Sequence, residues 1–237
     1  MAQGLLAGSR VSIPVKSLLV STTRADVRSI AGAHAKPGGA GYEVVSASAA
    51  DASAGTGART VVVAELTTAG AIRYRTVTMN GTTAVASGVS DVEDIPGAWV
   101  GTAGSGLVNA GAITIRGVSA GTTYAQILAA ENSLSPCKFQ VPANTVFVPD
   151  LVELESVNDD VIELWLMADM NPETGALNAG VYQAIASMIC GRGAPGVWTP
   201  IGNEVVVPAG ATLKLQAKST TGTCSIAGAI HGAIVPV

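Results

Sequence analysis

The sequence predicts an all-β protein with antiparallel sheets, a β-sandwich or jelly-roll-like fold with at most one or two short helices. Strand-sized runs recur about every 8–12 residues between Gly, Pro and Asn, which is typical of sandwiches and jelly rolls. Gly contributes 28 of the 237 residues and aromatic residues only 4%. Small side chains pack thin layers against sheets, and they do not build bulky helical cores.

The clearest local signal lies in residues 57–85. Two β-rich runs, 59–66 and 72–79, flank a short polar break, and Asn80-Gly81 follows the second run. Asn-Gly between strand-like runs is the strongest short-range hairpin signal, because a type I′ turn needs positive φ at both central residues. The stretch therefore predicts a three-stranded meander whose third strand begins after this turn.

Two arginines stand out in the second of these runs. Side chains alternate along a strand, so Arg73 and Arg75 share one face with Val77 and Met79. One interpretation places both arginines in solvent at a rim of the sheet, because Arg is mostly exposed. The alternative is a salt-bridged contact with a second subunit, which makes Arg73 and Arg75 the candidate subunit-contact residues.

Composition and the positions of turn residues predict three parts of the chain. These are an N-terminal arm or irregular segment, 1–41, a first β-sandwich region, 42–133, and a second, jelly-roll-like region, 134–237. The two β regions form either two subdomains or one continuous domain. Within the first segment, an alternating apolar run that contains Pro14 suits a short edge strand, because Pro is tolerated at sheet edges. The turn-rich residues 29–41 predict a loop or an arm that packs on a neighbour.

Two segments leave the choice between helix and strand open. Residues 122–133 have apolar spacing that fits a helix, but a strand through 124–127 fits almost as well. Residues 176–190 are equally ambiguous.

The charge content limits the kinds of partner that the protein can bind. Only 13% of residues are charged, about half the usual share, and the net charge is −4. Without a block of Lys and Arg, the chain lacks the basic surface of a nucleic-acid-binding protein.

Residues 1–20 lack the apolar core of a signal peptide, and the Gly- and Ser-rich residues 219–237 make a poor membrane span, so we expect a soluble protein. So little charge leaves two interpretations: a stable β-protein with a Thr/Ser surface, or a surface that copies of the chain or another protein cover.

The sequence predicts no metal, phosphate or cofactor site. Three separate cysteines without a CxxC pair indicate buried free thiols. The acidic stretches 88–97 and 169–175 do not match the ligand spacing of a Ca²⁺ loop. The glycines of 101–111 lack the Lys-Ser/Thr and the following helix of a phosphate-binding loop.

Catalytic chemistry is equally weakly indicated. His34 and His231 have no carboxylate or cysteine nearby in sequence, although a catalytic base needs an orienting partner. Glu153 and Glu155 share one face of a strand, as a glycosidase pair would. Solvated carboxylates fit better, because a hydrolase cleft would also need aromatic platforms. The sequence therefore predicts a protein that is not an enzyme.

Several strings resemble a recurrent pattern in virion structural proteins of tailed bacteriophages. They are spread over about two-thirds of the chain, outside 1–41, and read GTGARTVVV and TVTMNGTTAV within 52–85, AGSGLVNAGAITI at 103–115, YAQILAAEN at 124–132, KFQVPA at 138–143 and VPAGATLKLQAKS at 207–219.

The resemblance implies a capsid decoration (cement) protein, made in the host cytoplasm and bound to the exterior of the virion. Its partners would be the major capsid protein and further copies of itself, as a homotrimer at three-fold positions of the shell. The alternative is a tail- or fibre-associated protein that binds a receptor or glycan. Because these motifs are turn and strand signatures, they imply no chemistry, and the step to decoration is an analogy at the level of the fold.

Overall fold

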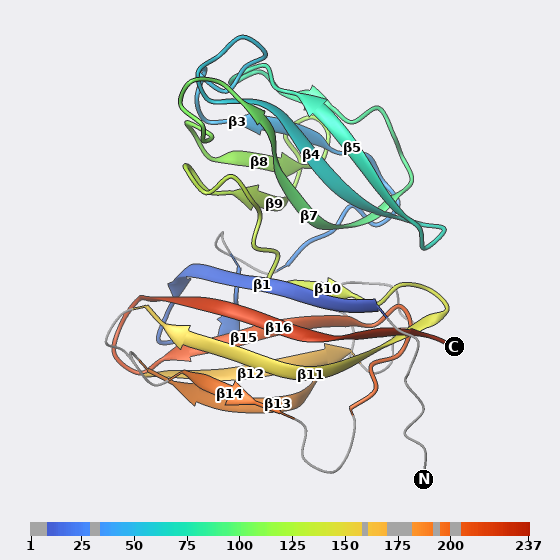
Figure 1. The fold of residues 1–237 in the computed structure, drawn as a ribbon, viewed down its shortest axis with the longest axis vertical. Coiled ribbons are helices and arrows are strands. Elements are labelled where there is room, and N and C mark those ends of the chain that lie inside the picture. Colours follow the sequence, from blue (N-terminus) through green and yellow to red (C-terminus); the bar gives the residue numbers. More distant parts are fainter. Residues whose placement is uncertain (1–8, 29–33, 158–160, 170–181, 192–194, 200–204) are drawn as a thin grey trace. The chain divides into compact units, whose positions relative to one another are not determined.

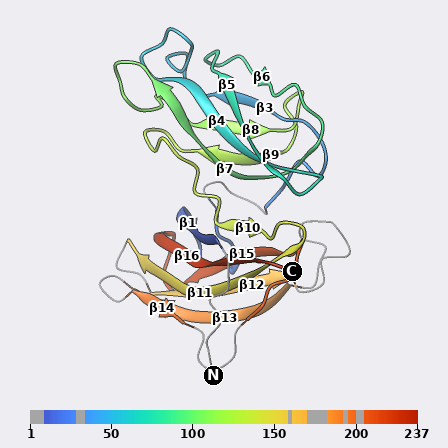
Figure 2. The same cartoon turned by 45° about the vertical axis from the view of Figure 1, so that its right-hand side comes forward.

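The computed structural model describes residues 9–28, 34–157, 161–169, 182–191, 195–199 and 205–237. These residues contain sixteen strands and no helix, and all the pairings between the strands are antiparallel (Figures 1 and 2). The predicted all-β, antiparallel class is confirmed.

The two ambiguous segments are strands where they are described. The helical candidate 122–133 contains β9 (Thr123–Ile127), in which Ala125 and Ile127 are buried and Gln126 points the other way. The sequence fits a helix and a strand almost equally well here. Burial of every second residue and pairing with β8 (Ile113–Arg116) show that the segment is a strand. The second segment ends in β13 (Tyr182–Cys190), and its residues 176–181 lie outside the described part of the chain.

The chain forms two compact units. Unit 1 combines Met1–Arg28 with Cys137–Val237, and unit 2 is the continuous stretch Ser29–Pro136, so unit 2 is inserted into the chain of unit 1. The division proposed from sequence, 1–41, 42–133 and 134–237, groups the N-terminal residues differently. Residues 9–28 do not form an irregular arm, because they contribute two strands to unit 1.

Unit 1 contains two sheets. Sheet A has the order β1 (Ser9–Val20), β16 (Cys224–Pro236), β11 (Thr145–Ser156), β14 (Gly196–Trp198). Sheet B has the order β10 (Lys138–Gln140), β15 (Thr212–Ser219), β12 (Ile162–Asp169), β13, with β2 (Ala25–Asp26) also paired to β15. In both views β1, β16 and β11 lie side by side (Figures 1 and 2).

One hydrophobic core of unit 1 takes alternate residues from both sheets. Phe147 and Leu154 come from sheet A, and Leu164, Leu166 and Leu213 from sheet B. Burying a side chain of this size stabilises the fold by about 1.5–3 kcal/mol before entropy is counted. Cys137, Cys190 and Cys224 are buried free thiols of this core, as the sequence predicts.

Unit 2 also contains two sheets around one core. Sheet C has the order β5 (Ile72–Thr78), β4 (Ala58–Thr67), β7 (Val92–Ala103), and sheet D has the order β6 (Val85–Ala86), β3 (Glu43–Ser46), β8, β9. Val61 and Val63 of sheet C and Ile113, Ile115 and Ile127 of sheet D are fully buried together.

The first hairpin of the predicted meander is confirmed, and its third strand is wrong. β4 and β5 pair from Thr60–Thr78 to Leu66–Ile72, and the polar break between them is the turn. After β5 the chain leaves sheet C: β6 pairs with β3 of sheet D, and the third strand of sheet C is β7.

A loop contact explains why Asn80-Gly81 does not close a hairpin. Gly81 has φ of 59°, but Asn80 is not in the left-handed region that a type I′ turn requires. Instead Asn80 forms a bridge with Ala52, and Gly81 donates its N–H to the carbonyl of Asp51. A Cβ on Gly81 would lie 3.0 Å from the Cα of Ala49, so glycine serves both the positive φ and the close approach.

Gly81→Ala therefore tests this loop contact. We expect it to lower the free energy of unfolding of unit 2 by about 2–4 kcal/mol, because strain at positive φ adds to a backbone clash. Gly88→Ala is the matched control: Gly88 has φ of 72° with nothing within 4 Å of the added methyl, so it should cost only about 1 kcal/mol. Urea unfolding measures both, and equal losses would contradict the close approach.

Candidate functional site

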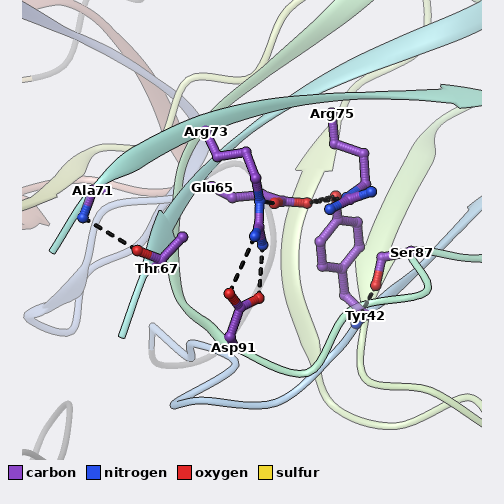
Figure 3. Close-up of polar contacts among 8 residues, drawn as sticks. All are labelled: Tyr42, Glu65, Thr67, Ala71, Arg73, Arg75, Ser87 and Asp91. Carbon is purple, nitrogen blue, oxygen red and sulfur yellow. Dashed lines mark hydrogen bonds and ion pairs between the residues drawn. The ribbon is translucent and has the colours of Figure 1, made fainter. Parts of the chain in front are cut away.

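The two arginines singled out from sequence meet a buried carboxylate. Glu65 of β4 is fully buried, and its Oε1 accepts hydrogen bonds from Tyr42 Oη at 2.6 Å and Arg75 Nε at 2.7 Å. Arg73 Nε donates to Glu65 Oε2 at 2.5 Å. The other end of Arg73 holds Asp91 with two further bonds of 2.7 and 3.1 Å (Figure 3).

Strand alternation produces this cluster, which we call the Glu65 cluster: Tyr42, Glu65, Arg73, Arg75 and Asp91. The arginines lie on the inward face of sheet C, one end of which is occupied by buried Val77 and Met79, as the sequence indicates. Register places Arg73 directly opposite Glu65 on the neighbouring strand. Cross-strand pairs of opposite charge stabilise a sheet. That these arginines contact a second subunit stays a prediction, since within one chain both already bind Glu65.

The cluster holds fixed charges and does not transfer protons near neutral pH. Burial alone would raise the pKa of Glu65, but the bonds from Tyr42, Arg73 and Arg75 outweigh it and hold that pKa below its usual range. Burial and the bond to Glu65 raise the pKa of Tyr42. Two carboxylates and two guanidinium groups therefore balance, with the phenol protonated. Such a cluster locks sheet geometry.

A second buried carboxylate, Asp51, ties three segments of unit 2 together. Its oxygens accept bonds from Ser46 Oγ at 2.6 Å and from the backbone N–H groups of Ala58, Ala110 and Gly111 at 2.7–2.9 Å. Burial alone would raise the pKa of Asp51, but these four donors together lower it. Sequence analysis missed this residue, because one Asp in a small-residue loop gives no signal of its distant partners.

A third carboxylate, Glu43 of β3, closes the turn between β8 and β9. It accepts a bond from Arg116 Nε at 2.7 Å and bonds from the N–H groups of Ser119 and Ala120, both of which have φ of 60°. Burial opposes ionisation, and the bonds from Ala120, Arg116 and Ser119 lower the pKa of Glu43 nonetheless. The carboxylate thereby stabilises a turn of two strained residues.

The acidic stretches considered as metal loops have other partners. Asp91 binds Arg73, Glu93 forms an ion pair with Lys36, and Asp94 is buried, with its carboxylate accepting from the N–H of Ile95. Of the second stretch only Asp169 is described, and the rest lies outside the described residues. In the described part of the chain, no group of three or more His, Cys, Asp or Glu could hold a metal ion.

The carboxylate pair Glu153 and Glu155 lies on the outer face of sheet A, as the sequence predicts for positions i and i+2 of a strand. They line an open hollow of about 250 Å³ with Pro195, Ala227 and others. His231 Nε2 lies 3.5 Å from Glu153 Oε1, a distance at the limit of a hydrogen bond. His231 and Glu153 are far apart in the sequence, so their proximity could not be predicted from it. The pairing of β11 with β16 brings them together.

The remaining polar candidates are buried. His34 is a buried residue of unit 2, whereas the two carboxylates of the hollow belong to unit 1. Burial raises the pKa of Cys137 to about 12 and that of Cys190 to about 11, so neither thiol is a ready nucleophile.

The outer face of sheet C carries exposed aromatic rings. Tyr74 of β5 is 66% exposed and Trp99 of β7 is 39% exposed, with ring centroids 5.9 Å apart and edge-to-face. Ile72 continues the patch at 46% exposure, and the Thr60 and Thr102 hydroxyls bond to each other at 2.8 Å. The positions of β4 and β5 that alternate with the inward residues hold no charged side chain: Thr60, Val62, Ile72, Tyr74, Thr76 and Thr78, together with Ala64 and Leu66, which are buried.

We call this surface the Tyr74 face. Because side chains alternate along β5, Tyr74 points away from the arginines, and this position can be predicted from the sequence. The position of Trp99 cannot be predicted in this way, because it depends on the pairing of Val62 with Trp99.

No protein-family model matches the chain, and no curated protein matches it significantly. In the part of the chain that the structure describes, no helix has the length and apolar character needed to cross a membrane.

Replacing both arginines tests the Glu65 cluster. Arg73→Ala with Arg75→Ala leaves an ionised carboxylate buried without cationic partners, so we expect a loss of about 3 kcal/mol in the free energy of unfolding of unit 2. The matched control is Arg59→Ala, because the exposed Arg59 of the adjacent strand donates only to the carbonyl of Gly55. Hydrogen exchange in β4 and β5 gives a readout confined to this unit. A double variant as stable as the control would contradict the role of the cluster.

Acid should destabilise unit 2. The pKa values of Glu43, Asp51, Glu65 and Asp91 are lowered by folding, so the unfolded chain binds more protons as pH falls. The stabilisation is complete above the ordinary carboxyl pKa of about 4–4.5 and is lost as pH falls through the folded values.

Hydrogen exchange in unit 2 between pH 7 and pH 3 measures this loss. Asp51→Asn should be less stable at neutral pH, because an amide cannot accept from all four donors. It should also show a shallower acid dependence than the unchanged chain. An unchanged acid slope in the variant would show that Asp51 contributes nothing to it.

Proposed function

We propose that the chain is a non-enzymatic virion structural protein, a decoration (cement) protein that binds the outer surface of a bacteriophage capsid. The observation that carries this proposal is the Tyr74 face: Ile72, Tyr74 and Trp99 are exposed on a face to which β4 and β5 contribute no charged side chain. Exposed apolar patches of this kind mark interaction sites, and Trp and Tyr are the residues most enriched in binding hot spots.

The finer fold forms part of the proposal. We infer that each unit is a β-sandwich of the jelly-roll-like class. In support, the buried residues of sheets A and B form one core, and those of sheets C and D form another. Two packed layers around one core are the usual solution for sheets with one apolar face.

The physical role would be to add contact area over subunit seams. A protein surface that binds another protein loses little free energy when it carries few charges to desolvate. The Tyr74 face meets this condition, because the charges of β5 point inward to Glu65. The partner would be the major capsid protein, and the resemblance of the sequence strings implies a homotrimer on the shell.

A second candidate function follows from the same rings. Aromatic faces stack on the apolar faces of sugar rings, and neighbouring hydroxyls bond to sugar hydroxyls. Tyr74 and Trp99 beside Thr60 and Thr102 provide both, so the alternative is a tail- or fibre-associated protein that binds a glycan receptor.

Tyr74→Ser with Trp99→Ser tests the leading proposal. We expect at least about a tenfold loss of affinity for capsids stripped of the protein, measured by co-sedimentation, because the change removes two aromatic anchors. Ile189→Ser on β13 of unit 1 is the matched control, since Ile189 is also highly exposed but lies on another sheet. Equal binding by the double variant would overturn the role of this face.

Copy number separates the two functions. Mass spectrometry of purified particles should find the chain in a fixed ratio to the major capsid protein if it decorates the shell. A few copies per particle, together with glycan binding that the double variant loses, would replace decoration by the receptor-binding alternative.

A further inference from the structure

The outer face of sheet A has a regular chemical pattern across its three long strands. β16 lies in the middle and presents alanines and His231 outward, with β1 on one side and β11 on the other. The inward residues of these strands, such as Ile13, Val152 and Ile230, are buried in the core. The outward residues are Arg10, Ser12, Pro14 and Lys16 on β1, Ala227, Ala229, His231 and Ala233 on β16, and Val148, Asp150, Leu151, Glu153 and Glu155 on β11.

Charge of opposite sign flanks the small residues. The charged outward residues of β1 are both basic, Arg10 and Lys16, and those of β11 are acidic. Register aligns them in rows across the sheet: Lys16, Ala227 and Glu155 form one row. Adjacent strands are about 4.8 Å apart, so the two charged ends of this row are about 10 Å apart in one chain.

We propose that this face, which we call the sheet A face, binds a second copy of the chain about a two-fold axis parallel to β16. Rotation about that axis places β1 of each copy over β11 of the other and β16 over β16. Lys16 then faces Glu155 of the second copy, and the contact occurs twice by symmetry.

The charge pattern selects this axis among the two that would bring the faces together. A two-fold axis perpendicular to the strands would lay β1 on β1 and β11 on β11, setting basic residues against basic and acidic against acidic. Juxtaposed like charges oppose such an arrangement. The parallel axis pairs opposite charges along both flanks.

The middle of the face permits close contact. Ala227 and Ala229, at the end of the face that carries Lys16 and Glu155, project only a methyl group, so the two sheets can approach there to the usual spacing of about 10 Å. Toward the other end of the face, His231 and the ion pair between Arg10 and Asp150, 2.9 Å in length, lie on the outer surface, so Arg10 is already bound within its own chain.

The area is at the lower limit for a specific dimer. Three strands of twelve or thirteen residues make a face about 40 Å long and about 14 Å wide, which buries about 1,100 Å² over two copies. Specific interfaces bury upwards of about 1,000 Å². The proposal does not depend on the capsid role, and it specifies a two-fold contact where the sequence resemblance implies a trimer.

Charge reversal in two separate chains tests the contact. Lys16→Glu and Glu155→Lys should each raise the dimer dissociation constant about tenfold or more, because each replaces two attractive contacts by two repulsive ones. An equimolar mixture of the two variants should dimerise again, since the carboxylate introduced on β1 of one chain then faces the ammonium group introduced on β11 of the other. Sedimentation equilibrium of the full chain measures all three, and circular dichroism confirms that the variants fold.

The mixture is decisive because rescue between chains excludes a charge pair within one chain. Ala229→Arg, which inserts a long side chain at the centre, should abolish dimerisation. Lys218→Glu on sheet B makes the same charge change away from the face and should leave the dimer intact. A monomeric or trimeric mass for the unchanged chain, a mixture that fails to associate, or a Lys218→Glu effect as large as that of Lys16→Glu would overturn the proposal.

Failure here is distinguishable from failure of the proposed function. Tyr74→Ser with Trp99→Ser should keep the dimer mass while it loses capsid binding. Ala229→Arg should do the reverse at the level of a single chain, because it leaves the Tyr74 face unchanged.

Discussion

The structure of unit 2 depends on carboxylates that the fold removes from water and supplies with its own donors. Glu65 connects the inward face of sheet C to Tyr42, which precedes β3 of sheet D, and Asp51 connects three segments at once. A core made mostly of Ala, Val and Ile leaves little apolar area with which to define loop positions. Hydrogen bonds to charged groups have strict geometry, so these few carboxylates define loop positions that the small side chains of the core do not define.

The same arrangement explains the polarity of sheet C. The charged side chains of β5 point into the unit, where they bind Glu65, and the aromatic side chains of β5 and β7 point out. This reversal of the usual pattern makes the outer face available for contact without the cost of desolvating charge. Sheet A differs: the charged residues of β1 and β11 lie on its outer face and are sorted by sign, on either side of a strand that presents alanines and His231. The two sheets thus present outer faces of different chemistry, one with exposed aromatic rings and the other with sorted charges.

Local rules were sufficient for part of this structure. The β4–β5 hairpin and the split of Arg73 from Tyr74 follow from turn chemistry and period-two alternation, which act over a few residues. The third strand of sheet C, the partners of Asp51 and the position of Trp99 depend on pairings between distant segments, which no local pattern encodes. Asn80-Gly81 illustrates the limit: a strong hairpin signal is used for a close approach to Ala49 instead.

The pairing of β1 with β16 sets the order in which the chain can fold during synthesis. β1 leaves the ribosome early, but its hydrogen-bonding partner is translated only after all of unit 2. Unit 2 is continuous and its pairings are nearer in sequence, so it can fold while the ribosome is still working. β1 must meanwhile persist as an unpaired edge, and Pro14 in its centre and the charges at Arg10 and Lys16 discourage it from aggregating until β16 arrives.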